Sequence, residues 1–294
     1  MEIKSIGVVG CGLMGHGIAQ ICAQAGWDVV VREAEQEKLD AGLAKVDKQL
    51  ARSVEKGKVD QADADAVRAR IRPTLDYADL GDCDLVIEAI VEDLSAKLEM
   101  WREVESVAKP EAFFATNTSS LSVAEQAAAT ERPERFLGLH FFNPAQVMPL
   151  LEVVRTEATS DEAYELGFEV GRALGKTTVA AGDNRGFIVN RLLVPYMLDA
   201  IRAHEQGVGS IEDIDRGMMA GASHPMGPLT LADFVGLDTL ASIADVMADF
   251  YGEDRFAQPD SLRTLVGAGH YGRKTGRGFY DYSGDSPVTV EPGT

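Results

Sequence analysis

Residues 4–15 read K-S-I-G-V-V-G-C-G-L-M-G, an apolar run that leads into a glycine-rich turn. The run over 4–10 predicts a buried strand ending in glycine, because it is short, rich in β-branched residues and bounded by a turn. Apolar side chains then recur at helical spacing over 13–25, and 27–31 has the pattern of a second strand. The opening segment is therefore predicted to be a strand–turn–helix–strand unit.

The turn matches the pattern G-x-G-x-x-G at Gly10, Gly12 and Gly15, with Leu13 and Met14 between the last two glycines. In this context the pattern is typical of a dinucleotide-binding loop. The first glycine permits a tight turn, the second lets a pyrophosphate approach the backbone, and the third allows close helix–strand packing. The N–H groups at the start of the helix favour an anion. The alternative is a glycine-rich turn that holds no ligand.

Glu33 follows the second predicted strand, where a carboxylate can accept hydrogen bonds from the adenosine ribose. Because it repels a 2′-phosphate, Glu33 favours NAD over NADP. The neighbouring Arg32 leaves NADP possible, since its guanidinium could turn toward such a phosphate.

Strands and helices continue to alternate beyond this unit. We expect an α/β fold over 1–183, a Rossmann-type, doubly wound, mostly parallel sheet. From 184 to 294 we expect an all-helical C-terminal domain without strands. The further strands are predicted at 83–89, 112–116, 136–142 and 150–154, a helix at 94–108, a polar helical stretch at 35–70, and the helices of the second domain at 185–207, 211–220, 228–250 and 259–268.

The composition narrows the classes of function. The chain has 294 residues and a formal net charge of −19, which makes nucleic acid an improbable partner. We expect no membrane span and no signal peptide, hence a cytoplasmic protein. Cys11, Cys22 and Cys83 are expected to be reduced, buried thiols, and no metal site is predicted.

Three polar clusters fall at or just after predicted strand ends, where open parallel sheets bind ligands. They are 117–120 (N-T-S-S), 140–144 (H-F-F-N-P) and Glu152, a carboxylate in an otherwise apolar strand. If Glu152 accepts a hydrogen bond from His140, it fixes the tautomer of a general base. The residue types alone leave open that His140 and Glu152 are unrelated. Asn190 could reach the same cleft or be solvated, and His16 is expected near the pyrophosphate.

Together these strings resemble the 3-hydroxyacyl-CoA dehydrogenase family, most closely its bacterial 3-hydroxybutyryl-CoA dehydrogenases. The resemblance covers 7–282 in the family's order and spacing. It is carried by G-C-G-L-M-G-H-G-I-A-Q, D-L-V-I-E-A-I-V-E, N-T-S-S-L-S, H-F-F-N-P-A-Q-V-M-P-L-L-E-V-V, G-F-I-V-N-R-L-L-V-P, H-P-M-G-P-L-T-L-A-D-F-V-G-L-D and G-R-K-T-G-R-G-F-Y-D-Y.

The resemblance implies a role for each matching residue. His140 would be the catalytic base and Glu152 the residue that orients it, while Ser119 and Asn190 would hold the substrate's oxygens. Arg52 and Lys56 would bind the coenzyme A of an acyl-CoA substrate, and the helical domain would form a homodimer. The positions where the family contacts the dinucleotide correspond to Glu92, Lys97, Ser119, Asn143 and Lys274.

Three departures from the family pattern stand out. The family often has Asp at Glu33, Ser at His16 and Lys at Pro149. Two rival functions also remain. A dehydrogenase of the 3-hydroxyisobutyrate or 6-phosphogluconate type would use a catalytic lysine and lack the H-F-F-N-P string. A dinucleotide-binding redox sensor or structural protein would have lost a catalytic residue.

Overall fold

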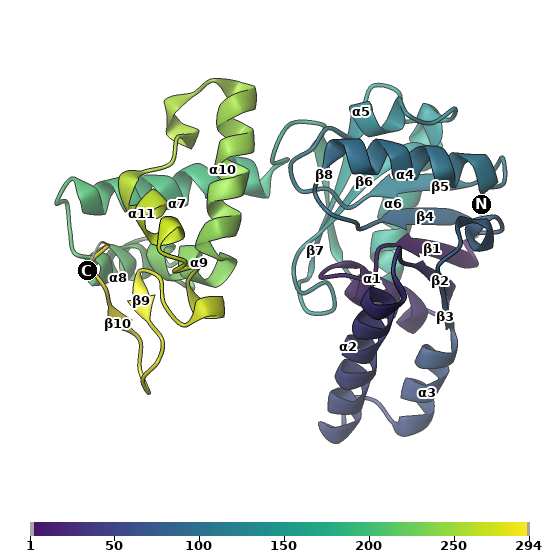
Figure 1. Cartoon of the computed structure of the whole chain (residues 1–294), viewed down its shortest axis with the longest axis horizontal. Helices are drawn as coiled ribbons and strands as arrows, with labels where there is room; N and C mark the ends of the chain where they lie inside the picture. Colours follow the sequence, from purple (N-terminus) through teal and green to yellow (C-terminus); the bar gives the residue numbers. More distant parts are fainter. Residues whose placement is uncertain (1–2, 293–294) are drawn as a thin grey trace. The chain divides into compact units, whose positions relative to one another are not determined.

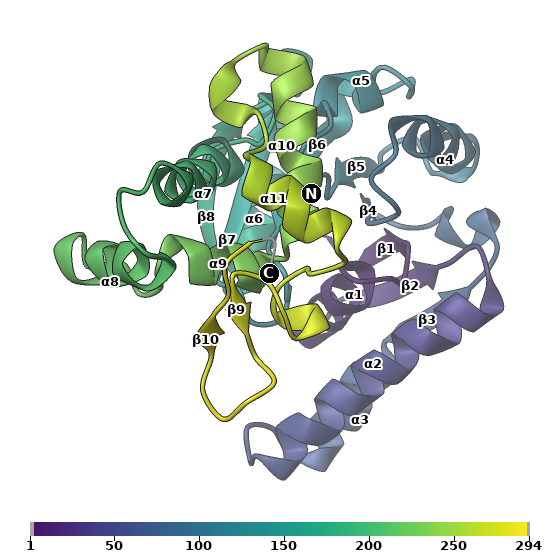
Figure 2. The same ribbon diagram turned by 60° about the vertical axis from the view of Figure 1, so that its left-hand side comes forward.

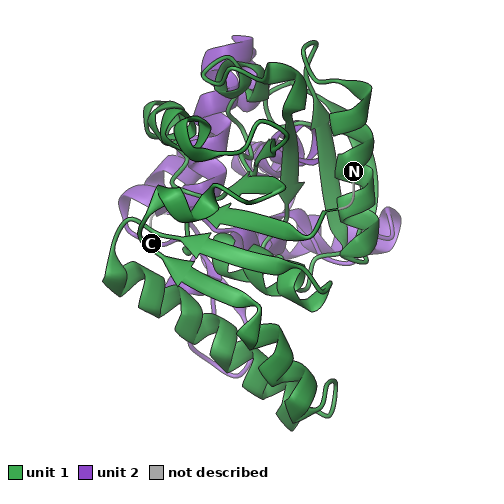
Figure 3. Cartoon of the chain, turned by 90° about the vertical axis from the view of Figure 1, so that its right-hand side faces the viewer, with its two compact units in different colours: residues 1–187 green, residues 188–294 purple. Residues whose placement is uncertain are grey.

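The computed structural model describes residues 3–292. The chain forms two compact units, Met1–Phe187 and Ile188–Thr294, which Figure 3 colours separately. Among the described residues no helix is long and apolar enough to cross a membrane. Cys11, Cys22 and Cys83 are free and buried, as expected from the sequence.

The first unit is built on one eight-stranded sheet in the order β3-β2-β1-β4-β5-β6-β7-β8 (Figure 1). β1 to β6 are parallel to one another, whereas β7 runs antiparallel to β6 and parallel to β8. The predicted mostly parallel, doubly wound sheet is confirmed. The strands are β1 (Ser5–Val9), β2 (Asp28–Arg32), β3 (Ile71–Thr74), β4 (Leu85–Glu88), β5 (Phe113–Thr116), β6 (Phe136–Phe141), β7 (Leu150–Arg155) and β8 (Thr177–Gly182).

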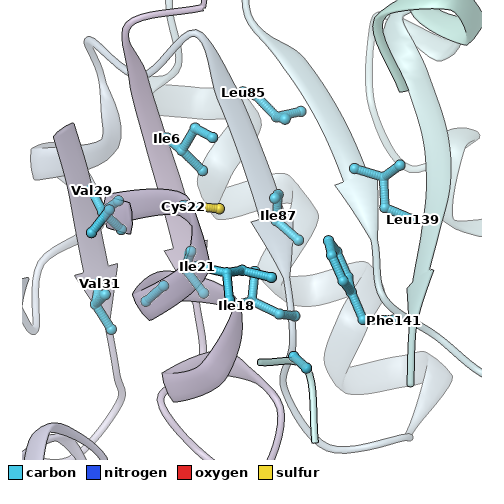
Figure 4. Close-up of a cluster of buried hydrophobic side chains, with 14 of the residues drawn as sticks. Ile6, Ile18, Ile21, Cys22, Val29, Val31, Leu85, Ile87, Leu139 and Phe141 are labelled. Carbon is cyan, nitrogen blue, oxygen red and sulfur yellow. The ribbon is translucent and has the colours of Figure 1, made fainter. Parts of the chain in front are cut away.

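Successive side chains of β6 enter two different apolar clusters, one on each face of the sheet. Leu139 and Phe141 of β6 join the cluster that includes α1 (Gly15–Gln24) and α6 (Asp161–Ala173) (Figure 4). Phe136 joins the cluster packed against α4 (Leu94–Val107) and α5 (Val123–Ala127). By this alternation His140, between Leu139 and Phe141, belongs to the α4 and α5 face.

The polar stretch predicted as helical over 35–70 forms two helices, α2 (Gln36–Glu55) and α3 (Gln61–Ala69), which lie side by side (Figure 2). Two strands of the sheet, β3 and β8, were not predicted. Both are edge strands: two of the four residues of β3 are exposed, and three of the six residues of β8 are exposed and only one is buried. Their sequences therefore lack the continuous apolar pattern of a central strand.

The second unit is helical, as predicted, with two corrections. The helix expected over 228–250 is broken into two, because Gly236 adopts φ 101° between them. A short antiparallel pair, β9 (Tyr280–Asp281) and β10 (Val288–Thr289), contradicts the expected absence of strands. Strands of two residues are too short to show the alternating pattern by which a strand is predicted from sequence. The helices are α7 (Val189–Glu205), α8 (Ile211–Gly221), α9 (Pro228–Val235), α10 (Leu237–Tyr251) and α11 (Asp260–Gly267).

Two buried carboxylates hold the second unit together. Asp215 accepts hydrogen bonds from the backbone N–H of Leu229 and Thr230 at the start of α9 and from the hydroxyl of Tyr280. Asp233 accepts from the backbone N–H groups of Phe279 and Tyr280. The C-terminal segment is thus fixed to α8 and α9 by charge-assisted hydrogen bonds.

Residues 3–292 also contain four short 3₁₀ turns. They are η1 (Tyr77–Leu80), η2 (Pro133–Arg135), η3 (Asp254–Phe256) and η4 (Arg273–Thr275).

Candidate active site

The glycine turn between β1 and α1 has the shape of an anion-binding loop. Gly10 adopts φ 99°, and a Cβ there would lie 2.5 Å from the carbonyl oxygen of Ala89. A Cβ on Gly15 would lie 1.9 Å from the carbonyl oxygen of Gly10. A Cβ on Gly12 would meet nothing within 4 Å, so this glycine leaves open space over the loop. No side chain caps the N-terminus of α1 at Met14, which leaves its N–H groups available to an anion.

Glu33 lies beside this turn, at the end of β2. Its carboxylate accepts hydrogen bonds from the backbone N–H of Cys11 at 2.8 Å and of Ala34 at 2.7 Å. Arg32 is engaged elsewhere: its guanidinium stacks 3.7 Å from the ring centroid of Tyr77 and donates to the carbonyl of Leu75. The charge next to the loop is therefore negative, which fits a ribose hydroxyl better than a phosphate.

His140 and Glu152 face one another across the antiparallel β6–β7 pair, in direct register. Nδ1 of His140 lies 2.6 Å from Oε2 of Glu152. Because a carboxylate can only accept, the proton is on Nδ1, and Nε2 is the nitrogen left for chemistry. His140 is 5% exposed and Glu152 is fully buried, so the pair is shielded from water.

Aromatic rings and one amide define the surroundings of this histidine. The rings of Phe142 and Phe187 lie 4.5 Å and 5.5 Å from the imidazole, centroid to centroid. The side-chain oxygen of Asn117, just after β5, accepts from the backbone N–H of Phe141. This contact ties the 117–120 cluster to the end of the strand that carries His140.

Glu92 organises the 118–120 loop. One of its oxygens accepts from the hydroxyl of Thr118 and from the backbone N–H groups of Ser119 and Ser120. Burial raises the pKa of Glu92, but the ammonium of Lys97 and these hydrogen bonds outweigh it and hold the pKa at about 2. The loop that carries Ser119 is thus anchored to a permanent negative charge.

Lys97, expected from the resemblance to contact the dinucleotide, is 1% exposed. Its ammonium forms ion pairs with Glu88 at 2.9 Å and with Glu92 at 2.7 Å. Glu88, which ends β4 and is fully buried, also accepts from the hydroxyl of Thr116. Sequence reasoning missed Glu88, although a carboxylate that ends an apolar strand is the same signal that singled out Glu152.

A cavity of about 330 Å³ lies at the amino ends of β1 and β2, and both acidic and basic side chains line it. A second cavity has a volume of about 540 Å³, and all the charged side chains that line it are basic. The second cavity, called here the basic cavity, is lined by His16, Lys45, Lys48, Gln49, Arg52, Ser53, Lys56, Lys58, Pro144 and Val147.

The structure brings together Arg52 and Lys56, the two predicted coenzyme A ligands, in the basic cavity. It adds Lys45 and Lys48 to them, to which the resemblance assigns no role. His16, expected near the pyrophosphate, also lines this cavity.

The remaining predicted site residues lie in separate places. Asn143 is exposed in the loop after β6. Asn190 lies in the first turn of α7, and Lys274 is ion-paired with Asp238 in the second unit. No group of three or more metal-ligating side chains occurs within residues 3–292.

Comparison with known proteins assigns both units to one family. Residues 5–184 match the model described as 3-hydroxyacyl-CoA dehydrogenase, NAD binding domain. Residues 186–282 match its C-terminal domain. The resemblance read from the sequence motifs is therefore confirmed.

Individual relatives match over nearly their whole length. A 3-hydroxybutyryl-CoA dehydrogenase of Mycobacterium tuberculosis is 47% identical over 95% of this chain and 99% of its own. One from Bradyrhizobium diazoefficiens is 46% identical, covering 97% of this chain and 98% of its own. The crystal structure of M. tuberculosis FadB2 superimposes with a TM-score of 0.93 at 47% identity, covering 96% of this chain and all of that one.

The crystal structure of (S)-3-hydroxybutyryl-CoA dehydrogenase PaaH1 from Ralstonia eutropha gives a TM-score of 0.92 at 39% identity, covering 96% of this chain and all of that chain. The two family models together match residues 5–184 and 186–282. This chain belongs to the 3-hydroxyacyl-CoA dehydrogenase family.

Proposed function

We propose that this chain interconverts a 3-hydroxyacyl-CoA and the corresponding 3-oxoacyl-CoA, with 3-hydroxybutyryl-CoA as the substrate. The observation that carries the proposal is the buried hydrogen bond between His140 and Glu152, in a chain of this family. Relatives named as 3-hydroxybutyryl-CoA dehydrogenases are 45–47% identical to it, which supports the short acyl chain.

His140 is the acid–base residue of this mechanism. In the oxidative direction Nε2 removes the proton of the 3-hydroxyl group, and Glu152 stabilises the imidazolium that forms. A bound nicotinamide dinucleotide supplies the hydride acceptor, or the hydride donor in the reverse direction. In reduction, the imidazolium of His140 returns a proton to the developing alkoxide.

Ser119 and Asn190 are proposed to hold the substrate's oxygens while these transfers occur. The support for Ser119 is the anchoring of its backbone N–H by Glu92, which fixes the loop that carries its hydroxyl. Orienting a substrate in this way converts binding energy into rate. For Asn190 the support is its place in the family's G-F-I-V-N-R-L string.

The proposed cofactor is NAD rather than NADP. The open space over Gly12 and the uncapped start of α1 fit a pyrophosphate, and the carboxylate of Glu33 fits the ribose. Arg32 stacks on Tyr77, so no free guanidinium at the end of β2 compensates a 2′-phosphate. Leu13 and Met14 would offer backbone N–H groups, and Lys97, Asn143 and Lys274 stay predicted contacts.

The basic cavity is the proposed site for the phosphates of coenzyme A. Arg52 and Lys56 are joined there by Lys45 and Lys48, so an acidic protein keeps one local positive region. Such a region attracts an anionic substrate despite an overall charge of −19.

We also propose a cytoplasmic homodimer formed through the helical unit. Exposed apolar side chains on that unit, among them Leu192, Phe234 and Phe250, support an interface. Sedimentation of the purified protein as a monomer would contradict it. The alternative of a redox sensor or structural protein without catalysis is disfavoured, since Ser119, His140, Glu152 and Asn190 are all present.

The direct test follows the absorbance of NADH after acetoacetyl-CoA is added to the purified protein. We expect consumption of NADH that depends on both substrates, faster with short than with long acyl chains, and slower with NADPH. No turnover with any 3-oxoacyl-CoA, with either cofactor, would contradict the proposed activity. Turnover of 3-hydroxyisobutyrate or 6-phosphogluconate instead would favour the rival dehydrogenases.

A further inference from the structure

His16 stands at the first turn of α1 and lines the basic cavity. The side chain is 7% exposed, and its Nδ1 lies 2.6 Å from the carbonyl oxygen of Gly12. The loop after β6 forms another part of the cavity through Pro144 and Val147. That loop is held in place by Lys176, which donates to the carbonyls of Ala145 and Met148.

The cations of this cavity are unusual for so acidic a chain. Lys45, Lys48, Arg52, Lys56 and Lys58 form no ion pair within the described residues, and no acidic side chain lines the cavity. Nearby basic residues are paired: Lys38 with Glu35, and Arg68 with Asp47. Cations left unneutralised around one hollow repel each other, and a bound polyanion would relieve that repulsion.

The hydrogen bond to Gly12 determines which ring nitrogen of His16 can bind a ligand. A carbonyl oxygen only accepts, so Nδ1 carries a proton in either charge state. Nε2 makes no hydrogen bond to any described residue. In the neutral ring Nε2 is an acceptor and makes no hydrogen bond to an ionised phosphate oxygen, which also only accepts, whereas in the imidazolium Nε2 is a donor.

We propose that His16 is a further ligand for the phosphate groups that enter the basic cavity, and that it binds them only as an imidazolium, so that ligand binding takes up a proton. The inference rests on the proposed binding of coenzyme A in this cavity. It makes His16, a position where the family often has serine, a pH-dependent determinant of substrate affinity.

The electrostatics of the ligand-free protein favour the neutral ring. Burial lowers the pKa of His16, the hydrogen bond to Gly12 opposes this shift, and the ammonium of Lys45 adds to the lowering. The charged groups that line the cavity with His16 come from α2 and the residues just after it, namely Lys45, Lys48, Arg52, Lys56 and Lys58; Pro144 and Val147 of the loop after β6 contribute none. A bound phosphate reverses the sign of this field, so the protonated ring is favoured in the complex.

The consequence has a defined sign. Since the complex holds a proton that the free protein lacks, affinity for the phosphate-bearing ligand falls as pH rises. The secondary ionisation of a phosphate monoester, with a pKa near 6, works in the opposite direction by adding ligand charge. A variant that cannot gain the proton isolates the contribution of His16 from that of the ligand.

The test is calorimetric titration of the full-length protein with coenzyme A, for the wild type and for His16→Asn. Asparagine keeps a donor for the carbonyl of Gly12 but does not titrate. We expect the wild type to bind about tenfold more tightly than His16→Asn at about pH 6, with the difference disappearing toward about pH 8. Titrations in two buffers of different ionisation enthalpy should show that the wild type takes up more protons on binding than His16→Asn, in which only the ligand phosphate titrates.

Controls separate this inference from the proposed function. Lys38→Gln removes one charge from α2 outside the cavity and should bind like the wild type. If Arg52→Ala with Lys56→Ala binds coenzyme A as tightly as the wild type, the proposed cavity is wrong. If that variant binds weakly but the ratio between wild type and His16→Asn is the same at every pH, only the role of His16 is overturned. Proton uptake on NADH binding instead of coenzyme A binding would overturn it as well.

Discussion

Nδ1 of His140 donates a hydrogen bond to Oε2 of Glu152 at 2.6 Å, between two residues that are direct partners in the β6–β7 register. Side chains of opposed residues in an antiparallel pair share a face of the sheet. The acid–base residue and the carboxylate that orients it are therefore held by backbone pairing rather than by a loop. Rigid supports of this kind preserve catalytic geometry.

Replacement of Glu152 by Gln keeps the size of the side chain and one acceptor oxygen for Nδ1 but removes the charge. We expect kcat to fall by roughly 10- to 100-fold, because the imidazolium formed during oxidation loses its stabilising partner. Steady-state kinetics with 3-hydroxybutyryl-CoA measure this effect, and the affinity for NAD should not change. A wild-type kcat for Glu152→Gln would show that orientation alone, without charge, is sufficient.

Glu92→Gln tests the anchoring of the Ser119 loop. The neutral amide cannot match the carboxylate that accepts from Thr118, Ser119 and Ser120, so the loop should loosen and kcat/KM should fall by about tenfold or more. Equal kcat/KM for the wild type and Glu92→Gln would show that Glu92 does not position Ser119.

The same variant makes a prediction for stability. The folded-state pKa of Glu92, about 2, lies below its ordinary value of 4.5, so its contribution is present above about pH 4.5 and is lost as pH falls toward 2. The difference in free energy of unfolding between wild type and Glu92→Gln should therefore be constant near neutral pH and shrink in acid. Denaturant unfolding at several pH values measures it.

Glu33→Gln tests the choice of cofactor. Loss of the carboxylate should raise KM for NADH by about tenfold, since hydrogen bonds to charged groups are worth more than neutral ones. It should also reduce the discrimination against NADPH, because the repulsion of a 2′-phosphate disappears. Glu35→Gln, an exposed position two residues away that pairs with Lys38, is the matched control. Unchanged discrimination in Glu33→Gln would place cofactor selectivity in other residues.

The raised pKa of Asp233 predicts that the stability of the second unit depends on pH. Burial raises its pKa to about 6, from an ordinary value of 3.8, although the N–H groups of Phe279 and Tyr280 oppose this shift. A raised folded-state pKa means that stability is gained as pH falls through about 6 and lost as pH rises through it. Scanning calorimetry of the wild type and of Asp233→Asn should show the wild type gaining relative to the variant between about pH 7 and about pH 5. A constant difference would contradict the raised pKa.

The central part of the fold could be predicted because its sequence signals are local. The glycine turn, the apolar central strands and the switch to helical periodicity each follow from short-range patterns. The strands β3 and β8 could not be predicted, because edge strands need no continuous apolar run. β3 also contains Pro73, which is unfavourable in a central strand. The helix break at Gly236 depends on the positive φ of this residue. An isolated glycine in a helical pattern does not predict such a φ.

The candidate site depended on long-range pairing that no local pattern contains. Both strands around His140 and Glu152 were predicted, but the antiparallel register that joins the two residues was not visible in the sequence. Lys97 illustrates the same limit: the resemblance placed it at the dinucleotide, and only the fold shows that its buried ammonium pairs with Glu88 and Glu92. The environment of His16 likewise depended on how α1 packs against α2.

The most direct test of the account is the turnover of His140→Gln in the reduction of acetoacetyl-CoA by NADH. Glutamine fills the site without supplying a proton at the position of Nε2, so kcat should fall about 100-fold or more. NADH affinity, measured by fluorescence titration of the same preparation, should match that of the wild type and establish that the dinucleotide site is intact. Turnover near the wild-type rate in His140→Gln would contradict the assignment of His140 as the acid–base residue.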